Sequence, residues 1–212
     1  MIEDIYAKRQ KVINYKKDGP SSELMHELIH KTYELVASKQ NLMPYKIHVL
    51  GPDCKKYKEE LYKLTTKAVD EKYFRTTANV QVFAPWVLIF TARLAEPNEF
   101  VYKCIHEEGH SYQPCFPETY LNSGPIRTTC IEIGMFAKIF TGLCLEQDID
   151  ISYTKCFRSW PNNKVKDPEW SGLPFVNDPP LFVMVAGYRQ EHVHIPGETK
   201  PDFDEVVCFE HE

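Results

Sequence analysis

The spacing of apolar residues predicts a helix followed by a strand in the first quarter of the chain. Apolar residues recur every three or four positions over 24–36, which is the period of a helix. Ser21 or Ser22 precedes this pattern as a candidate N-cap, and the pattern stops around Ala37. Residues 45–51 then read as a strand that ends at a Gly-Pro turn.

The rest of the chain shows signals for one charged helix and several strands. The helix is expected over 53–68. Residues 82–92 form an apolar run, which indicates a strand buried on both faces. Two more strands are expected at 149–153 and 181–188, and 206–209 reads as a short strand that could reach another subunit.

The clearest predicted element is a long apolar helix that opens with Thr129-Cys130-Ile131-Glu132. These residues fit a capping box, in which Thr caps a backbone N–H and Glu reaches back. The helix is apolar on nearly every side until Glu146, so it must be surrounded by protein. It forms either the centre of the domain or half of a subunit interface.

Composition narrows the class of protein. The 212 residues suit one large domain or two small ones, and the lack of a long linker favours a single domain over 1–212. Helices interleaved with buried strands are typical of an α/β or α+β fold. A net charge of -5 without a Lys/Arg block argues against a nucleic-acid partner. The apolar runs at 83–90 and 181–186 are too short to span a bilayer.

The N-terminus and the cysteines indicate a cellular compartment. The first residues are acidic and form no apolar signal segment. Seven cysteines without a C-x-x-C pair argue against a disulfide framework or a zinc ribbon. We therefore expect a cytoplasmic protein with no membrane partner.

Two H-E-x-x-H motifs raise an alternative function, that of a zinc-dependent hydrolase. Two histidines one helical turn apart can hold zinc, and the Glu between them can act as a base. One motif lies at 26–30. In the other, His106 and His110 would be ligands, Glu107 the base, and Glu132 a distant third ligand.

The helical wheel favours a solvated face for both motifs. At about 100° per residue, Leu24 and Leu28 lie on one side of the first helix, and His26 and His30 lie on the opposite, charged side. The histidines of the second motif also fall among charged residues. Neither motif continues into the longer zincin pattern.

Three separated segments carry a resemblance to a known family. They are residues 9–15, residues 37–45, and the pair formed by 132–134 and 150–157. In this order, with Ala-Gly-Tyr at 186–188 and a terminal Lys-Pro, the chain resembles the FMN-dependent nitroreductases. The resemblance covers nearly the whole chain and is looser over 97–123 and 157–173.

This resemblance implies a fold, an assembly and an activity. The expected fold is α+β and three-layered, with a central, mainly antiparallel sheet flanked by helices in an intertwined homodimer. FMN would lie at the subunit interface. NAD(P)H would deliver hydride through flavin N5 to a flat electron-poor acceptor, such as a nitroaromatic, a quinone or an enone.

The resemblance assigns the FMN phosphate and ribityl chain to the basic N-terminal segment. Arg9, Gln10 and Lys11 match the first three positions of the family's R-R-S-x-R pattern, and charged donors suit phosphate oxygens. Ile13 stands where the family has Arg or Lys beside the flavin N1–O2 edge. Lys155 is one candidate to replace that charge.

The resemblance also implies that a turn from the partner subunit reaches the flavin. Ala37, Ser38 and Asn41 match the family's P-S-x-x-N-x-Q-P segment, with Met43 in place of Gln. Ser and Asn can hydrogen-bond the polar edge of a flavin, but the same residues also satisfy turn backbone. Lys39, inside this turn, is the second candidate for the missing charge.

Two further regions complete the implied cofactor site. Tyr153, Lys155 and Cys156 stand where the family packs a loop on one flavin face, and the family usually has Glu-Gly at the last two positions. Lys200 matches a basic residue that reaches the phosphate. The departures at Ile13 and Met43 leave open a second alternative, a flavin-binding dimer without catalysis.

Overall fold

The computed structural model describes most of the chain, and the elements below belong to that part. The described residues are 2–64, 69–70, 75–76, 79–93, 99–107, 124–154, 173, 180–190 and 206–207.

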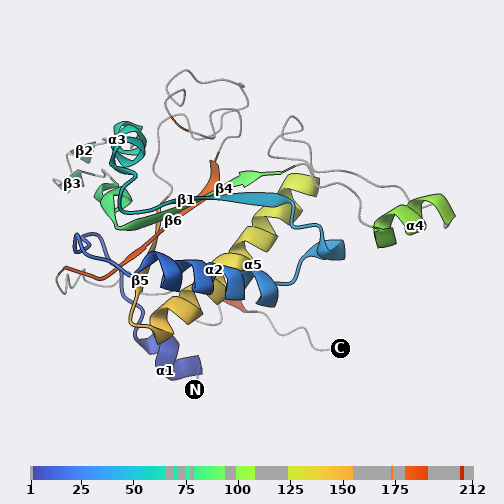
Figure 1. The fold of residues 1–212 in the computed structure, drawn as a ribbon, viewed down its shortest axis with the longest axis horizontal. Coiled ribbons are helices and arrows are strands. Elements are labelled where there is room, and N and C mark those ends of the chain that lie inside the picture. The colour runs from blue at the N-terminus through green and yellow to red at the C-terminus, as the bar shows by residue number, and fades with distance from the viewer. Residues whose placement is uncertain are drawn as a thin grey trace.

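A four-stranded antiparallel sheet forms the centre of the molecule (Figure 1). Its strands lie in the order β1 (Tyr45–Leu50), β4 (Trp86–Ala92), β6 (Pro180–Gly187) and β5 (Asp150–Thr154). A separate pair joins β2 (Val69–Asp70) to β3 (Arg75–Thr76).

The described part of the chain also contains helices. They are α1 (Ile2–Ala7), α2 (Ser22–Leu35), α3 (Lys55–Lys63), α4 (Glu99–Glu107) and α5 (Gly124–Glu146), with 3-10 turns η1 (Lys39–Asn41) and η2 (Val80–Phe83).

The side chains of β4 divide the core into two halves, which makes the fold three-layered. Leu88 and Phe90 face the side covered by α2 and α5, where Phe136 and Met25 join them. Alternate residues such as Ile89 face the other side, which α3 and η2 cover. Every residue of β4 is buried, as expected for a strand with both faces covered. Figure 1 shows α2 and α5 together on one side of the sheet and α3 on the other.

The predicted α+β class and antiparallel sheet are therefore confirmed. The N-cap is Ser21, whose side chain accepts a hydrogen bond from the Leu24 N–H at 3.2 Å. The strands predicted at 45–51, 149–153 and 181–188 agree with β1, β5 and β6 within one residue.

Other predicted boundaries are wrong. The 82–92 strand begins only at Trp86, because residues 82–83 belong to η2 and Pro85 cannot donate to a sheet ladder. The charged helix begins at Lys55 and ends at Lys63, and residues 65–68 lie outside the described part. At the C-terminus, Val206 and Val207 are not in a strand.

The start of the long helix is also different from the prediction. α5 begins at Gly124, where Pro125 suits a first turn. Thr129 therefore lies inside the helix and is fully buried. Glu132 does not close a capping box; its side chain accepts a hydrogen bond from another segment.

α5 is apolar enough to be compared with a membrane span. Its segment Thr128–Glu146 has a mean hydropathy of 1.4, and half of that segment is buried inside the protein. The buried side packs on the sheet through Ile133, Phe136 and Phe140. A core helix passes the same test of length and composition, and the packing of α5 fits that explanation.

A buried lysine joins α3 to the start of β4. The Nζ of Lys58 donates to the carbonyls of Ala84 and Pro85 at 2.8 and 2.7 Å, and the residue is 4% exposed. Burial lowers the pKa of Lys58 to about 8, because the interior disfavours the charged amine. A neutral amine still has two protons for these two carbonyls.

This lysine should make the folded protein more stable at higher pH. Between pH 8 and 10.5 the unfolded chain holds the Lys58 proton and the folded chain does not, so the free energy of unfolding rises with pH in this window. The rise should be on the order of 2 kcal/mol. Urea unfolding of wild type and Lys58→Met at pH 7 to 9.5 measures it, and identical slopes for both proteins would contradict it.

Candidate functional site

The N-terminal segment is fixed against the end of the sheet. The Ser152 hydroxyl donates to the Val12 carbonyl at 2.6 Å, and the Tyr15 hydroxyl donates to Ser152 Oγ at 2.8 Å. The Lys16 N–H donates to the Tyr188 carbonyl at 2.8 Å. Burial raises the pKa of Tyr15 far above its usual range, so its hydroxyl stays a donor. These bonds place the basic segment beside β5.

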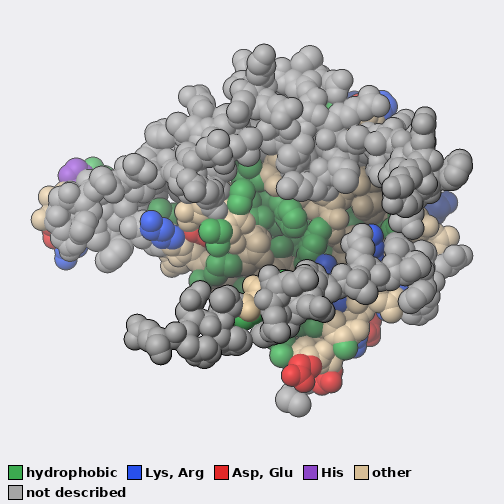
Figure 2. All heavy atoms as spheres, turned by 180° about the vertical axis from the view of Figure 1, so that it is seen from behind, with side chains coloured by type: hydrophobic (Ala, Val, Ile, Leu, Met, Phe, Trp, Pro, Cys, Tyr) green, Lys and Arg blue, Asp and Glu red, His purple; other side chains and the backbone are tan. Residues whose placement is uncertain are grey.

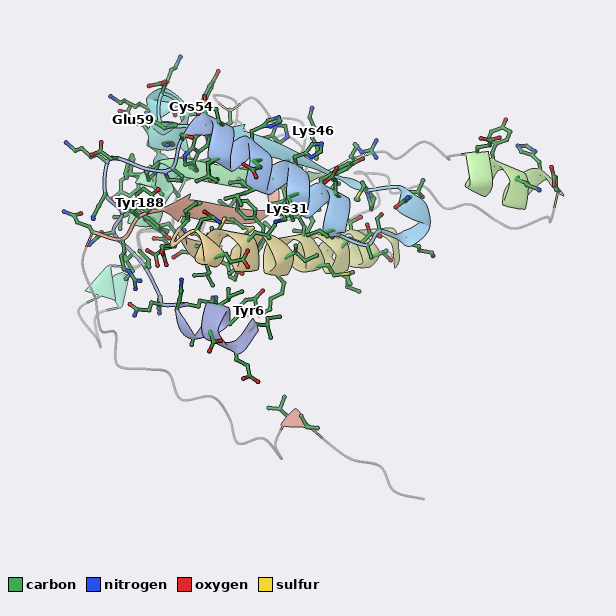
Figure 3. The ribbon with its side chains drawn as sticks, turned by 60° about the horizontal axis from the view of Figure 1, so that its bottom comes forward. Tyr6, Lys31, Lys46, Cys54, Glu59 and Tyr188 are labelled. Carbon is green, nitrogen blue, oxygen red and sulfur yellow. The ribbon has the colours of Figure 1, made fainter. Side chains whose placement is uncertain are left out.

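α1 anchors the other end of this segment on α5. The Tyr6 hydroxyl donates to the Lys138 carbonyl at 2.7 Å, and the Lys138 ammonium lies 3.5 Å from the centre of the Tyr6 ring. Gly142 permits this approach, because a Cβ there would lie 2.9 Å from the Tyr6 hydroxyl. Lys8 pairs with Asp148 at 2.8 Å. Figure 3 shows Tyr6 between α1 and α5.

A cation and an aromatic ring meet between these anchors. The Arg9 guanidinium carbon lies 5.2 Å from the centre of the Tyr153 ring, a cation–π distance. Tyr153 is 37% exposed, and its hydroxyl lies 2.7 Å from Thr141 Oγ1. Lys11 is exposed on the same segment, whereas Ile13 is half-buried and brings no charge. The arrangement offers two cations and an aromatic face.

The predicted second half of the site is a tight turn after α2. Ser38 Oγ accepts a hydrogen bond from the Met43 N–H at 2.8 Å, and the Asn41 N–H donates to the Ser38 carbonyl at 3.1 Å. Ser38 therefore satisfies turn backbone, and its hydroxyl proton remains for another acceptor. The side chains of Ala37, Lys39 and Asn41 are exposed.

The two halves do not meet within one chain. The turn is attached to α5 at Glu132, whereas Tyr153 is attached at Thr141. Glu132 and Thr141 are about 13 Å apart along α5, at a rise of 1.5 Å per residue. The expectation that the halves come from different subunits stays a prediction.

Several predicted site residues lie outside the described part of the chain. They are Lys155, Cys156, Lys200 and His110. Gln10 is described and exposed, and it has an interaction of its own.

The described residues do not support the zinc alternative. His26 and His30 are exposed on α2, and His30 lies 3.6 Å from Glu34. His106 and Glu107 are exposed on α4, which stands away from the sheet in Figures 1 and 3. Within the described ranges, no three His, Cys, Asp or Glu side chains form a group that could hold a metal ion.

Sequence reasoning missed Thr141 and Arg93, and it gave Glu132 other roles, in a capping box or as a distant third zinc ligand. Thr141 holds the Tyr153 hydroxyl, Glu132 holds the turn through a backbone N–H, and Arg93 binds the carbonyls of the same turn. A buried Thr and Glu inside an apolar helix were the available signal, because buried polar groups need partners. No pattern in the neighbouring sequence indicated the role of Arg93.

Comparison with known proteins places the chain by its fold. No protein-family model matches the chain, and no curated protein matches it. Solved structures do match. The NfrA1 nitroreductase from B. subtilis is 14% identical, with 100% of this chain and 74% of that chain covered at a TM-score of 0.66.

Two other similar solved structures are described with FMN. A protein from Exiguobacterium sibiricum, described as a nitroreductase in complex with FMN, is 16% identical; 99% of this chain and 97% of that chain are covered, at a TM-score of 0.67. A protein from Staphylococcus epidermidis, described as an NAD(P)H:FMN oxidoreductase, is 14% identical, with 99% and 95% covered at 0.66. The chain therefore has the nitroreductase fold, and the resemblance seen in the sequence is confirmed at the level of the fold.

Proposed function

We propose that this protein is an FMN-dependent oxidoreductase that works as a homodimer in the cytoplasm. NAD(P)H is its hydride donor, and its second substrate is a flat electron-poor acceptor such as a nitroaromatic, a quinone or an enone. The observation that carries the proposal is the basic segment fixed along β5, with Arg9 over the exposed face of Tyr153.

The chemistry of the described side chains suits FMN. Arg9 and Lys11 are exposed cations, which bind phosphate through charge-assisted hydrogen bonds. The Ser38 hydroxyl and the Asn41 amide provide donors and acceptors for the edge of the ring system. The nitroreductase fold and the FMN complex of the E. sibiricum protein support the same assignment.

In this proposal the side chains of the site bind FMN and orient it. Bound FMN would supply the redox chemistry, which is hydride transfer between NAD(P)H and the acceptor. Arg9 and Lys11 would hold its phosphate end, and Tyr153 would line one side of the ring system. Ser38 and Asn41 of the partner subunit would hydrogen-bond the ring edge. No titratable side chain of this set is required as a nucleophile.

Exposed apolar side chains on α5 support the homodimer. Ile131 is 64% exposed and Met135 is 39% exposed, and a Cβ on Gly134 would meet nothing within 4 Å. Figure 2 shows apolar side chains gathered over the middle of the rear face, where α5 runs. A second copy on this face would cover these side chains.

Replacing Arg9 should separate phosphate binding from ring binding. Arg9→Ala removes one charged donor, so the Kd for FMN should rise about tenfold. The Kd for riboflavin, which has no phosphate, should stay within about twofold. Quenching of flavin fluorescence measures both, and Lys63→Ala on α3 is the matched control, with no change for either flavin.

The unaltered protein provides the decisive test of the proposal. It should purify yellow or turn yellow with FMN, and the flavin absorbance should bleach under NADPH or NADH without oxygen. A colourless protein that binds no added FMN contradicts the proposal. Bound FMN without any bleaching favours the alternative of a flavin-binding dimer without catalysis.

A further inference from the structure

Two residues of the 38–44 turn have a positive φ. Asn41 has φ of 58° and Met43 has φ of 46°. Asparagine adopts this left-handed region more readily than most residues, whereas methionine adopts it only at a cost. Such residues persist where the surroundings over-determine them, and they cluster at functional sites. The question is what holds this turn.

Arg93, directly after β4, holds the far end of the turn. Its backbone N–H donates to the Pro44 carbonyl at 3.1 Å, and its Nε donates to the Met43 carbonyl at 3.1 Å. A terminal guanidinium nitrogen donates to the Leu42 carbonyl. One residue therefore binds three consecutive carbonyls around the strained position.

Glu132 holds the near end from inside α5. The residue is 3% exposed, and its Oε1 accepts the Lys39 N–H at 3.0 Å. Its Oε2 is buried and has no hydrogen-bond partner among the described residues. Burying a carboxyl group costs free energy when one of its oxygens has no hydrogen-bond partner. This cost points to a role for Glu132 beyond ordinary packing.

The fixed backbone presents one exposed side chain. Asn41 lies between the two held ends, and its side chain is exposed. An amide offers both a donor and an acceptor, and a held backbone lowers the entropy lost when that amide binds.

We propose that Arg93 and Glu132 are positioning residues that hold the 38–44 turn so that Asn41 presents its amide to the flavin ring bound with the partner subunit. This inference rests on the proposed function. It adds two residues that act through Asn41 and touch neither the phosphate nor the reacting atoms.

A double-mutant cycle tests this coupling. Arg93→Lys keeps the charge and loses the fork that binds two carbonyls, so the Kd for both FMN and riboflavin should rise about tenfold. This differs from Arg9→Ala, which affects FMN alone. In an Asn41→Ala background, Arg93→Lys should have little further effect, because the two residues act as one unit.

Hydrogen exchange tests the hold without any flavin. In the FMN-free protein, Glu132→Ala should speed exchange of the Lys39 amide at least tenfold and weaken flavin binding. Glu132→Gln keeps an oxygen for that N–H and should restore both properties to within about threefold. Should Glu132→Ala fail to fold, the cycle on Arg93 and the Glu132→Gln protein still decide the matter.

Arg189→Lys is the matched control for Arg93→Lys. Arg189 lies two residues after β6, where its Nε is 3.4 Å from Asp150, and its replacement should be additive with Asn41→Ala. If the unaltered protein binds flavin and the effects of Arg93→Lys and Asn41→Ala are additive, this inference is wrong and the proposed function still stands. An unaltered protein that binds neither flavin overturns the proposed function and this inference with it.

Discussion

Glutamates in place of Ile131 and Met135 should convert the protein to a monomer with little affinity for FMN. Both side chains are exposed on the face of α5 that is proposed as the dimer interface, and two charges buried there would oppose association strongly. The proposed site takes Ser38 and Asn41 from the partner subunit, so the Kd for FMN should rise at least about 100-fold. Light scattering gives the mass, and flavin fluorescence gives the Kd.

The matched control for this double variant is Tyr57→Glu. Tyr57 is 37% exposed on α3, on the opposite side of the sheet, and its replacement should leave both mass and affinity unchanged. Circular dichroism should show the same helix content in all three proteins. A double variant that stays dimeric, or an unaltered protein that is monomeric and binds FMN, contradicts the proposed assembly.

Phe136→Ala should cause the largest loss of stability among single substitutions in the core. Phe136 is fully buried, and its ring centre lies 5.5 Å from that of Phe90 and 6.1 Å from that of Tyr45. The cavity should cost about 3–5 kcal/mol. In a chain of this size, the Tm should fall by about 10 °C.

Phe83→Ala is the matched control, because it removes the same ring from a half-exposed position. Phe83 is 49% exposed, and its ring lies 4.9 Å from that of Tyr62. We expect a cost of about 1 kcal/mol. Equal losses for the two variants in thermal unfolding would show that Phe136 is not central to the core.

Much of the fold was predictable because its signals are local. The N-cap Ser21 and the helical spacing behind it place α2, and the apolar run places β4. The boundary at Trp86 was missed because an apolar 3-10 turn and an apolar strand have the same composition. The start of α5 was missed because Thr129 and Glu132 imitate a capping box. In the structure Thr129 is buried inside the helix, and Glu132 accepts a hydrogen bond from Lys39.

The candidate site was predictable only in part. The resemblance selected Arg9 and Tyr153, and the structure brings them together. It did not select Arg93, and it gave Glu132 no role at the flavin site although 132–134 is one of the matching segments. Both roles depend on contacts between segments far apart in the sequence. Whether the turn meets the basic segment depends on a second copy, which a single chain does not supply.

The anchoring of the N-terminal segment has a consequence for the speed of ligand capture. Its backbone is tied to α5 through Tyr6 and to the sheet through Val12 and Tyr15, so only the side chains between these ties must settle around an anion. Association should then approach the rate at which an anion collides with exposed cations, and it should slow as ionic strength rises.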